Sequence, residues 1–231
     1  MTDHLERAQL GVIRHALEPI VELDAGHILS FEVCSFSESK ALLDQSYFGD
    51  VEQYPMVSLL TRQLEFFQKL NLHEPQLYRA AFVNVPPSLF EHWLSWQDFV
   101  PFILQFRLSI GCNTASLVDG MSAQALERLL QLKELGVTLW LNNADDALYK
   151  VPADILHAFS GIKINKRFFW QCFNRNDAAF MEHAFAVWGN KSVIVEGVEN
   201  RHHLSFVRAQ GLMQGQGFHW RAKLSRHAHW H

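Results

Sequence analysis

The sequence predicts an α/β fold, a modified TIM-like (β/α)8 barrel with one antiparallel strand near the N-terminus. Three observations support this prediction. Short apolar runs typical of β-strands recur along the chain, helical patterns separate most of them, and the 231 residues approach the roughly 250 of such a barrel. The first two runs are the exception, because only a short connection around residues 24–26 separates them. That is the spacing of a β-hairpin, which requires antiparallel strands.

The predicted strands are bounded by polar or turn residues and alternate with helical segments. In chain order they are residues 17–23, 28–34, 80–85, 106–111, 137–141, 161–164, 193–196 and 212–218. Apolar residues return every three or four positions in the predicted helices at 55–70, 122–135, 177–188 and 201–210. Asn200 directly precedes the last helix, so we expect it to cap that helix.

Composition favours one compact domain, residues 1–231, with the barrel over about 12–224 and a short tail at 225–231. Hydrophobic residues make up 48% of the chain, enough for a large core. The formal net charge of −4 argues against direct nucleic-acid binding. No signal peptide or membrane span is visible, so we expect a cytoplasmic protein without a membrane partner.

The three cysteines have neither metal-binding nor disulfide-frame spacing and are interpreted as small packed thiols, with redox sensing as the alternative for Cys34 and Cys112. The histidines at 227, 229 and 231 could chelate a metal, but a frayed terminus is the preferred interpretation. Residues 36–55 are interpreted as a loop over the barrel or a partner-binding segment. Aromatic residues at 93, 96, 99 and 102 are expected on a helix, in the core or at an interface.

Polar residues recur where the predicted strands end. They are Glu32, Asn84, Ser109, Asn142, Asn143, Lys163, Asn165, Glu196, Glu199 and Gln216. The reactive groups of a (β/α)8 barrel stand at the C-terminal ends of its strands. Since an unpaired buried charge is costly, the pattern predicts one convergent pocket.

These residues lie within short motifs that follow one another along the chain. The motifs are LEPI at 17–20, EVCSF at 32–36, NVPP at 84–87, LGV at 135–137, NNAD at 142–145, KIN at 163–165, EGVE at 196–199 and QGF at 216–218. Through them the sequence resembles the EAL domain, the family of cyclic-di-GMP phosphodiesterases, over about residues 17–218. The resemblance implies the barrel fold and a site at its mouth.

The family's chemistry uses two divalent cations held between carboxylates to activate water. By resemblance, the metal ligands would be Glu32, Asn84, Ser109, Asn142 and Glu196, with Asn143 at the place of a second aspartate. Three of the family's carboxylates are therefore two amides and a hydroxyl here. Hard cations prefer anionic oxygens, and an amide cannot act as a general base. We expect no metal, no cofactor and no catalytic residue, only a vestigial site that also includes Lys163, Glu199 and Gln216.

The family's nucleotide contacts are also altered. Phe36 stands where the family has a phosphate-pairing arginine, Glu18 replaces a glutamine, and Cys112 replaces a second glutamate. We therefore expect cyclic-di-GMP not to bind. We interpret Lys163 as the partner of Glu32 or Glu196 in a buried ion pair, with residual metal or nucleotide binding as the alternative.

An intact fold with an altered site favours action through the surface of the protein. The chain resembles stand-alone enteric regulators that bind the flagellar transcription activator FlhD/FlhC, which implies a non-catalytic repressor of flagellar gene expression acting on that protein partner. Fold alone does not fix function. The alternatives are a weak or vestigial cyclic-di-GMP phosphodiesterase and a cyclic-di-GMP receptor without hydrolysis.

Overall fold

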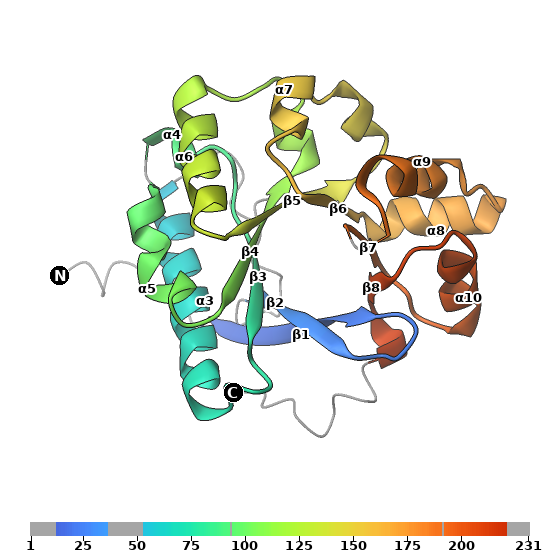
Figure 1. The fold of residues 1–231 in the computed structure, drawn as a ribbon, viewed down its shortest axis with the longest axis horizontal. Coiled ribbons are helices and arrows are strands. Elements are labelled where there is room, and N and C mark those ends of the chain that lie inside the picture. Colours follow the sequence, from blue (N-terminus) through green and yellow to red (C-terminus); the bar gives the residue numbers. More distant parts are fainter. Residues whose placement is uncertain (1–12, 37–52, 93, 191, 221–231) are drawn as a thin grey trace.

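Eight strands close into a barrel in the order β1 to β8, surrounded by helices (Figure 1). The computed structural model describes residues 13–36, 53–92, 94–190 and 192–220. The strands are β1 (Arg14–Glu22), β2 (Ile28–Phe36), β3 (Ala80–Asn84), β4 (Arg107–Asn113), β5 (Thr138–Ala144), β6 (Gly161–Ile164), β7 (Val193–Glu196) and β8 (Gln214–Gln216). The predicted (β/α)8 fold is confirmed.

The antiparallel strand is β1, which runs antiparallel to both β2 and β8, whereas the pairs from β2 to β8 are all parallel. Its connection to β2 spans residues 23–27 and is longer than the sequence predicts. The backbone N–H of Leu23 donates to the carbonyl of Met213 over 2.8 Å instead of continuing the β1–β2 pairing. Gly26, with φ of +68°, then turns the chain, a conformation that glycine adopts easily.

The helices of four or more residues are α3 (Gln53–His73), α4 (Leu89–His92), α5 (Val100–Ile103), α6 (Ala123–Glu134), α7 (Ala153–Leu156), α8 (Lys166–Arg175), α9 (Ala179–Trp188) and α10 (Arg201–Ala209). All four predicted helices are present, and the Asn200 cap is confirmed by its side chain, which accepts a hydrogen bond from the N–H of His203. The last predicted strand is too long, because a 3-10 helix begins at Phe218.

The aromatic residues at 96, 99 and 102 do not lie on one helix. Trp96 and Phe99 belong to the 3-10 helix η1 (Trp96–Phe99), and Phe102 belongs to α5. Phe99 and Phe102 are buried, and Trp96 packs against the main core, which supports the core interpretation for these three. Residue 93 of the same pattern lies outside the described residues, as do the tail at 225–231 and residues 37–52 of the predicted loop.

Two layers of apolar packing support the barrel. The larger one fills the space between the strands and the helices. The smaller one lies inside the barrel and consists of Ile20, Phe82, Trp140 and Ile194. Gly161 makes room for the Trp140 ring, since a Cβ at position 161 would lie 2.6 Å from it. The barrel interior is therefore filled with side chains beneath its mouth. Within the described residues, no helix is long and apolar enough to cross a membrane.

Candidate functional site

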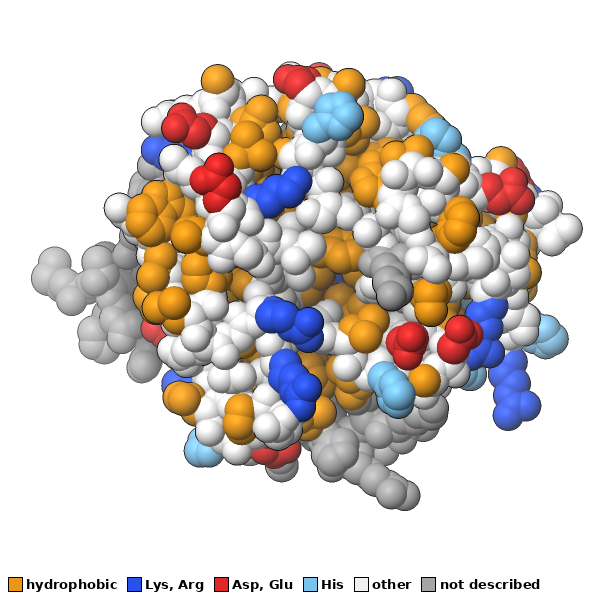
Figure 2. Space-filling view, in the orientation of Figure 1, with side chains coloured by type: hydrophobic (Ala, Val, Ile, Leu, Met, Phe, Trp, Pro, Cys, Tyr) orange, Lys and Arg blue, Asp and Glu red, His pale blue; other side chains and the backbone are white. Residues whose placement is uncertain are grey.

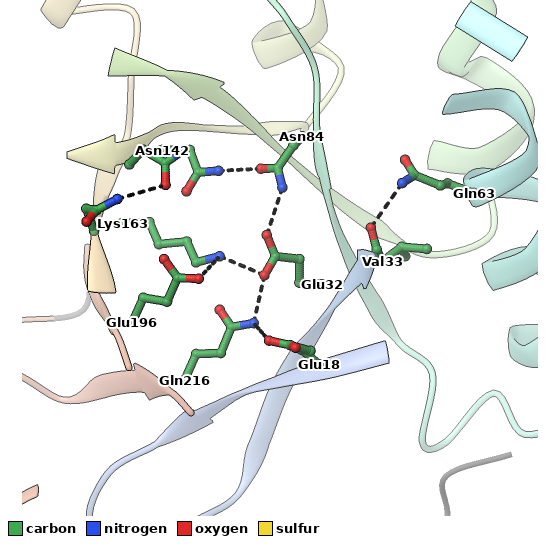
Figure 3. Close-up of polar contacts among 11 residues, drawn as sticks. Glu18, Glu32, Val33, Gln63, Asn84, Asn142, Lys163, Glu196 and Gln216 are labelled. Carbon is green, nitrogen blue, oxygen red and sulfur yellow. Dashed lines mark hydrogen bonds and ion pairs between the residues drawn. The ribbon is translucent and has the colours of Figure 1, made fainter. Parts of the chain in front are cut away.

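The carboxyl ends of the parallel strands bring together most of the predicted site residues (Figure 3). Successive residues of a strand point to opposite sides, so the inward positions of neighbouring strands converge at the barrel mouth. The mouth cluster consists of Glu18, Glu32, Asn84, Asn142, Lys163, Glu196 and Gln216. Six of these seven residues are members of the predicted site, and Glu18 is the addition.

Glu32 is the centre of the mouth cluster. Its Oε1 accepts a hydrogen bond from Asn84 Nδ2 over 2.8 Å. Its Oε2 accepts from Lys163 Nζ and from Gln216 Nε2, each over 2.7 Å. Glu32 is 4% exposed and Lys163 is 1% exposed, so the pair is removed from water. Both oxygens of the carboxylate are thus held by protein donors.

In this pair, each residue stabilises the charged form of the other. Burial alone would raise the pKa of Glu32, but the Lys163 charge and the three hydrogen bonds together lower it. Burial would also lower the pKa of Lys163, and the charges of Glu32 and then Glu196 raise it instead. Glu196 is the more distant and more exposed partner, with 4.0 Å between its Oε1 and Lys163 Nζ. The predicted buried ion pair of Lys163 is therefore made with Glu32.

A relay of amides extends the cluster across the mouth. Asn142 Nδ2 donates to Asn84 Oδ1 over 2.6 Å, and Asn84 in turn donates to Glu32. The Oδ1 of Asn142 is buried and has no hydrogen-bond partner among the described residues. Asn84 therefore uses both its N–H donor and its carbonyl acceptor for hydrogen bonds within the mouth cluster.

Glu18 joins the cluster from β1, where it pairs directly with Glu32 of β2. Gln216 Nε2 donates to Glu18 Oε2 over 3.0 Å as well as to Glu32. Although the residue is exposed, partial loss of solvent around its carboxylate and the neighbouring charge of Glu32 raise the pKa of Glu18. The sequence identifies Glu18 only as a changed family position, whereas the hairpin register places it beside Glu32.

Ser109, a metal-ligand position by resemblance, is not among the residues of the mouth cluster. Leu108, Ile110 and Cys112 pack into the outer core, so the alternate residues of β4 face the barrel interior. The strand register pairs Gly111 with Asn84 and Ser109 with Phe82. A Cβ at position 111 would lie 2.8 Å from Asn84 Oδ1. The position of β4 that faces the cluster is therefore 111, where glycine offers no side chain.

The remaining predicted residues support the loops around the mouth. Asn143 has φ of +55°, a left-handed conformation that asparagine tolerates, and its Oδ1 accepts from Asn165 Nδ2 over 3.4 Å. Asn165 caps α8 by accepting from the N–H groups of Arg167 and Phe168. Glu199 forms an ion pair of 2.6 Å with Lys166. Asn143 and Glu199 thus have structural contacts outside the mouth cluster.

The described residues fit two divalent cations poorly, although Glu18 and Glu196 bring two further carboxylates to the mouth cluster. Such cations bind several anionic or carbonyl oxygens that are free to coordinate. Here the oxygens of Glu32 accept three N–H groups, the ammonium of Lys163 lies among them, and Gly111 contributes no donor side chain. Asn142 Oδ1 is an available oxygen, but it is neutral. Among the described residues, the Glu32 carboxylate is therefore held by protein donors, whereas the buried side-chain oxygens of Asn142 and Gln216 have no hydrogen-bond partner.

Glu18, Glu32 and Cys34 bring possible ligand atoms within 4.8 Å of one another. Metals bind thiolates, and burial followed by the charges of Glu32 and Glu18 raises the pKa of Cys34 well above its usual value. The ammonium of Lys163 also donates to Oε2 of Glu32, so this oxygen is not free to bind a metal. Burial raises the pKa of Cys112 to about 12, so this thiol too stays protonated. These environments support the interpretation of both cysteines as packed thiols.

Comparison with known proteins gives a family model and a set of similar structures. The model described as the EAL domain matches residues 3–223. No curated protein sequence matches the chain.

Three solved structures illustrate the similarity. BlrP1 from Klebsiella pneumoniae, in a calcium and cyclic-di-GMP complex, is 19% identical with a TM-score of 0.70, covering 89% of this chain and 54% of that one. The EAL enzyme Bd1971 in its cGMP-bound form is 18% identical with a TM-score of 0.69, covering 95% and 64%. The EAL-like domain protein YdiV is 17% identical with a TM-score of 0.64, covering 90% and 91%. The chain spans less than two thirds of Bd1971 and of BlrP1, and at these identities the likeness concerns the fold.

Proposed function

The chain belongs to the EAL-domain family, and from this premise we propose that it acts without catalysis, as a regulator that binds another protein. The proposed partner is a transcription activator of the flagellar FlhD/FlhC type. Binding would repress flagellar gene expression after the activator has been translated. The partner is inferred from the resemblance of the motifs to stand-alone enteric members of the family.

One observation carries the non-catalytic part of the proposal. Glu32, the glutamate of the motif that names the family, uses both carboxylate oxygens to bind protein N–H groups, including the buried ammonium of Lys163. A pair of cations would have to displace these donors while gaining no ligand from Gly111. Every donor of this carboxylate is supplied by the protein, at the place where the family carries out hydrolysis.

The net charge supports a protein partner. At −4, the chain has no excess of basic residues to neutralise the phosphates of DNA. A regulator of this kind would therefore act on the activator rather than on the promoter.

Binding of the purified chain to purified FlhD/FlhC complex, measured by titration calorimetry, tests the proposal. We expect saturable binding and reduced binding of the activator to a flagellar promoter fragment in a mobility-shift assay. Lack of binding to the activator would contradict the proposed partner. The chain without activator, added to the same promoter fragment, is the control and should produce no shift.

Two assays with cyclic-di-GMP address the other functions. We expect no product with Mg²⁺ or Mn²⁺ and no heat of binding. Product formation that is lost in Glu32→Ala would replace the proposal by a weak phosphodiesterase. Heat without product would indicate a receptor that binds the dinucleotide without cutting it.

A further inference from the structure

A groove of about 430 Å³ opens at the end of the barrel opposite the mouth cluster. It lies between the end of α3, the connection from α3 to β3, the end of α5, the start of β4 and the turn from α6 to β5. Phe106 and Leu108 line it and are 4% and 2% exposed, so they form a fixed apolar floor. Arg79, Arg107 and Leu104 line it as well, and we call the whole site the basic groove.

The basic groove exposes a large apolar side chain beside its buried floor. Leu104, which lines the groove, is 79% exposed. Figure 2, just below and left of its centre, shows hydrophobic side chains next to basic ones, over the part of Figure 1 where α3 ends and β3 and β4 begin. An exposed leucine beside an apolar floor is typical of a protein-binding surface.

Among the described residues, no ion pair compensates the charge of the basic groove. Arg79 and Arg107 are exposed, and Arg79 donates to the side chain of Gln76. Within the part of the chain that the structure describes, no carboxylate forms an ion pair with either arginine, and the groove lining contains no Asp or Glu. Two positive charges thus stand together on a chain whose formal net charge is −4.

We propose that the basic groove binds an acidic amphipathic segment of the regulated protein partner. Apolar side chains of the segment would cover Leu104 and the floor formed by Phe106 and Leu108, while its carboxylates would pair with Arg79 and Arg107. Guanidinium groups bind carboxylates through two parallel hydrogen bonds, which fixes the orientation of the segment. This inference rests on the proposed function, because it names the surface through which the protein partner is recognised.

Titration calorimetry with purified FlhD/FlhC complex at low and high NaCl tests the inference. We expect Arg79→Glu/Arg107→Glu and Leu104→Ser each to weaken binding by about tenfold or more. Wild-type binding should weaken as salt rises, and the charge-reversal variant should lose most of this salt dependence. Arg201→Glu and Val187→Ser, which change exposed residues of α10 and α9, are the matched controls and should bind like the wild type. Thermal unfolding of each variant verifies that it is folded.

The possible outcomes separate the inference from the proposed function. Wild-type binding that both groove variants retain would overturn the inference and leave the proposed function standing. Loss of binding in Leu104→Ser alone would contradict an acidic occupant. A change in the oligomeric state of Leu104→Ser without the activator would show that a second copy fills the groove, which also overturns the inference. If the wild type does not bind the activator, the proposed function is wrong and the inference falls with it.

Discussion

The ammonium of Lys163 on β6 lies 2.7 Å from a carboxylate oxygen of Glu32 on β2, and both side chains are buried. The two residues are 131 positions apart in the sequence and meet because their strands face each other across the barrel. A buried ion pair is costly to break from one side, since the remaining charge has no water and no partner. The pair therefore ties the stability of the whole barrel to the geometry of its mouth.

Replacement of one member of this pair should be strongly destabilising. We expect Lys163→Met to lower the free energy of unfolding by about 3–5 kcal/mol, because it leaves Glu32 buried and unpaired. The double variant Glu32→Gln/Lys163→Met should recover much of that loss, since it removes both charges. Urea unfolding of the four proteins in this cycle measures the coupling. If Lys163→Met and the double variant unfolded with the same free energy, a coupled pair would be contradicted.

Magnesium should not raise the melting temperature of the wild type. We expect Mg²⁺ not to bind, and a ligand that bound only the folded state would have to stabilise it.

The variant Asn142→Asp should be less stable than the wild type by about 1–3 kcal/mol, since it places an acceptor against Asn84 Oδ1 and removes the donor. Magnesium should restore part of this loss, because the new carboxylate is an anionic ligand. Differential scanning calorimetry with and without Mg²⁺ tests both statements. Clear stabilisation of the wild type by Mg²⁺ would show that the mouth binds the ion.

His15 should make stability depend on pH in the acidic range. Burial, and then the charge of Arg62, lower the pKa of His15 from 6.5 to about 4. Its Nδ1 lies 2.9 Å from Ser35 Oγ, which Gln63 also contacts. As pH falls, the unfolded chain takes up the proton first, so the stabilisation is complete above about pH 6.5 and is lost as pH falls towards 4.

The variant His15→Gln isolates this effect, since glutamine keeps a hydrogen-bonding group and does not titrate. The difference in unfolding free energy between wild type and variant should shrink by about 2–3 kcal/mol between neutral pH and pH 4. Urea unfolding across this range measures it. A difference that stays constant with pH would exclude His15 as the source.

Two inward glycines should differ in their tolerance of a methyl group. A Cβ at Gly161 would lie 2.4 Å from the backbone carbonyl of Ser192, which cannot move without distorting β7. A Cβ at Gly111 would approach the side chains of Phe82 and Asn84, which can adjust. We expect Gly161→Ala to cost about 1–3 kcal/mol or more and Gly111→Ala to cost less. Thermal unfolding of both variants gives the comparison, and the reverse order would contradict these packing assignments.

Strand-end polar residues made most of the mouth cluster predictable. Glu32, Asn84, Lys163 and Gln216 lie in the second half or at the end of their strands, and a barrel brings such positions together whatever their distance along the chain. Position 111 escaped prediction because a glycine has no side chain that indicates a role. The register between β3 and β4 places Gly111 beside Asn84, and the pattern of a single strand does not reveal such a register.

Glu18 and α8 were missed for different reasons. The place of Glu18 depends on its cross-strand pairing with Glu32, which follows from a hairpin connection longer than the sequence indicated. The segment of α8 was not among the predicted helices, although its apolar side chains gather on one face, where Phe169 and Cys172 are buried. Its N-cap Asn165 was identified as a family position rather than as a helix start.

The antiparallel β1 gives the barrel its closing seam, where it meets β8 through the pairs Val21 with Gly215 and Glu22 with Gln214. Among the described strands, the one synthesised last is therefore the one that completes the sheet. Until β8 emerges, β1 and β7 each present an unpaired backbone edge, the kind of surface that recruits other chains into aggregates. A nascent chain arrested before Gln214 should accordingly depend on chaperones for its solubility more than a chain in which β8 has paired with β1.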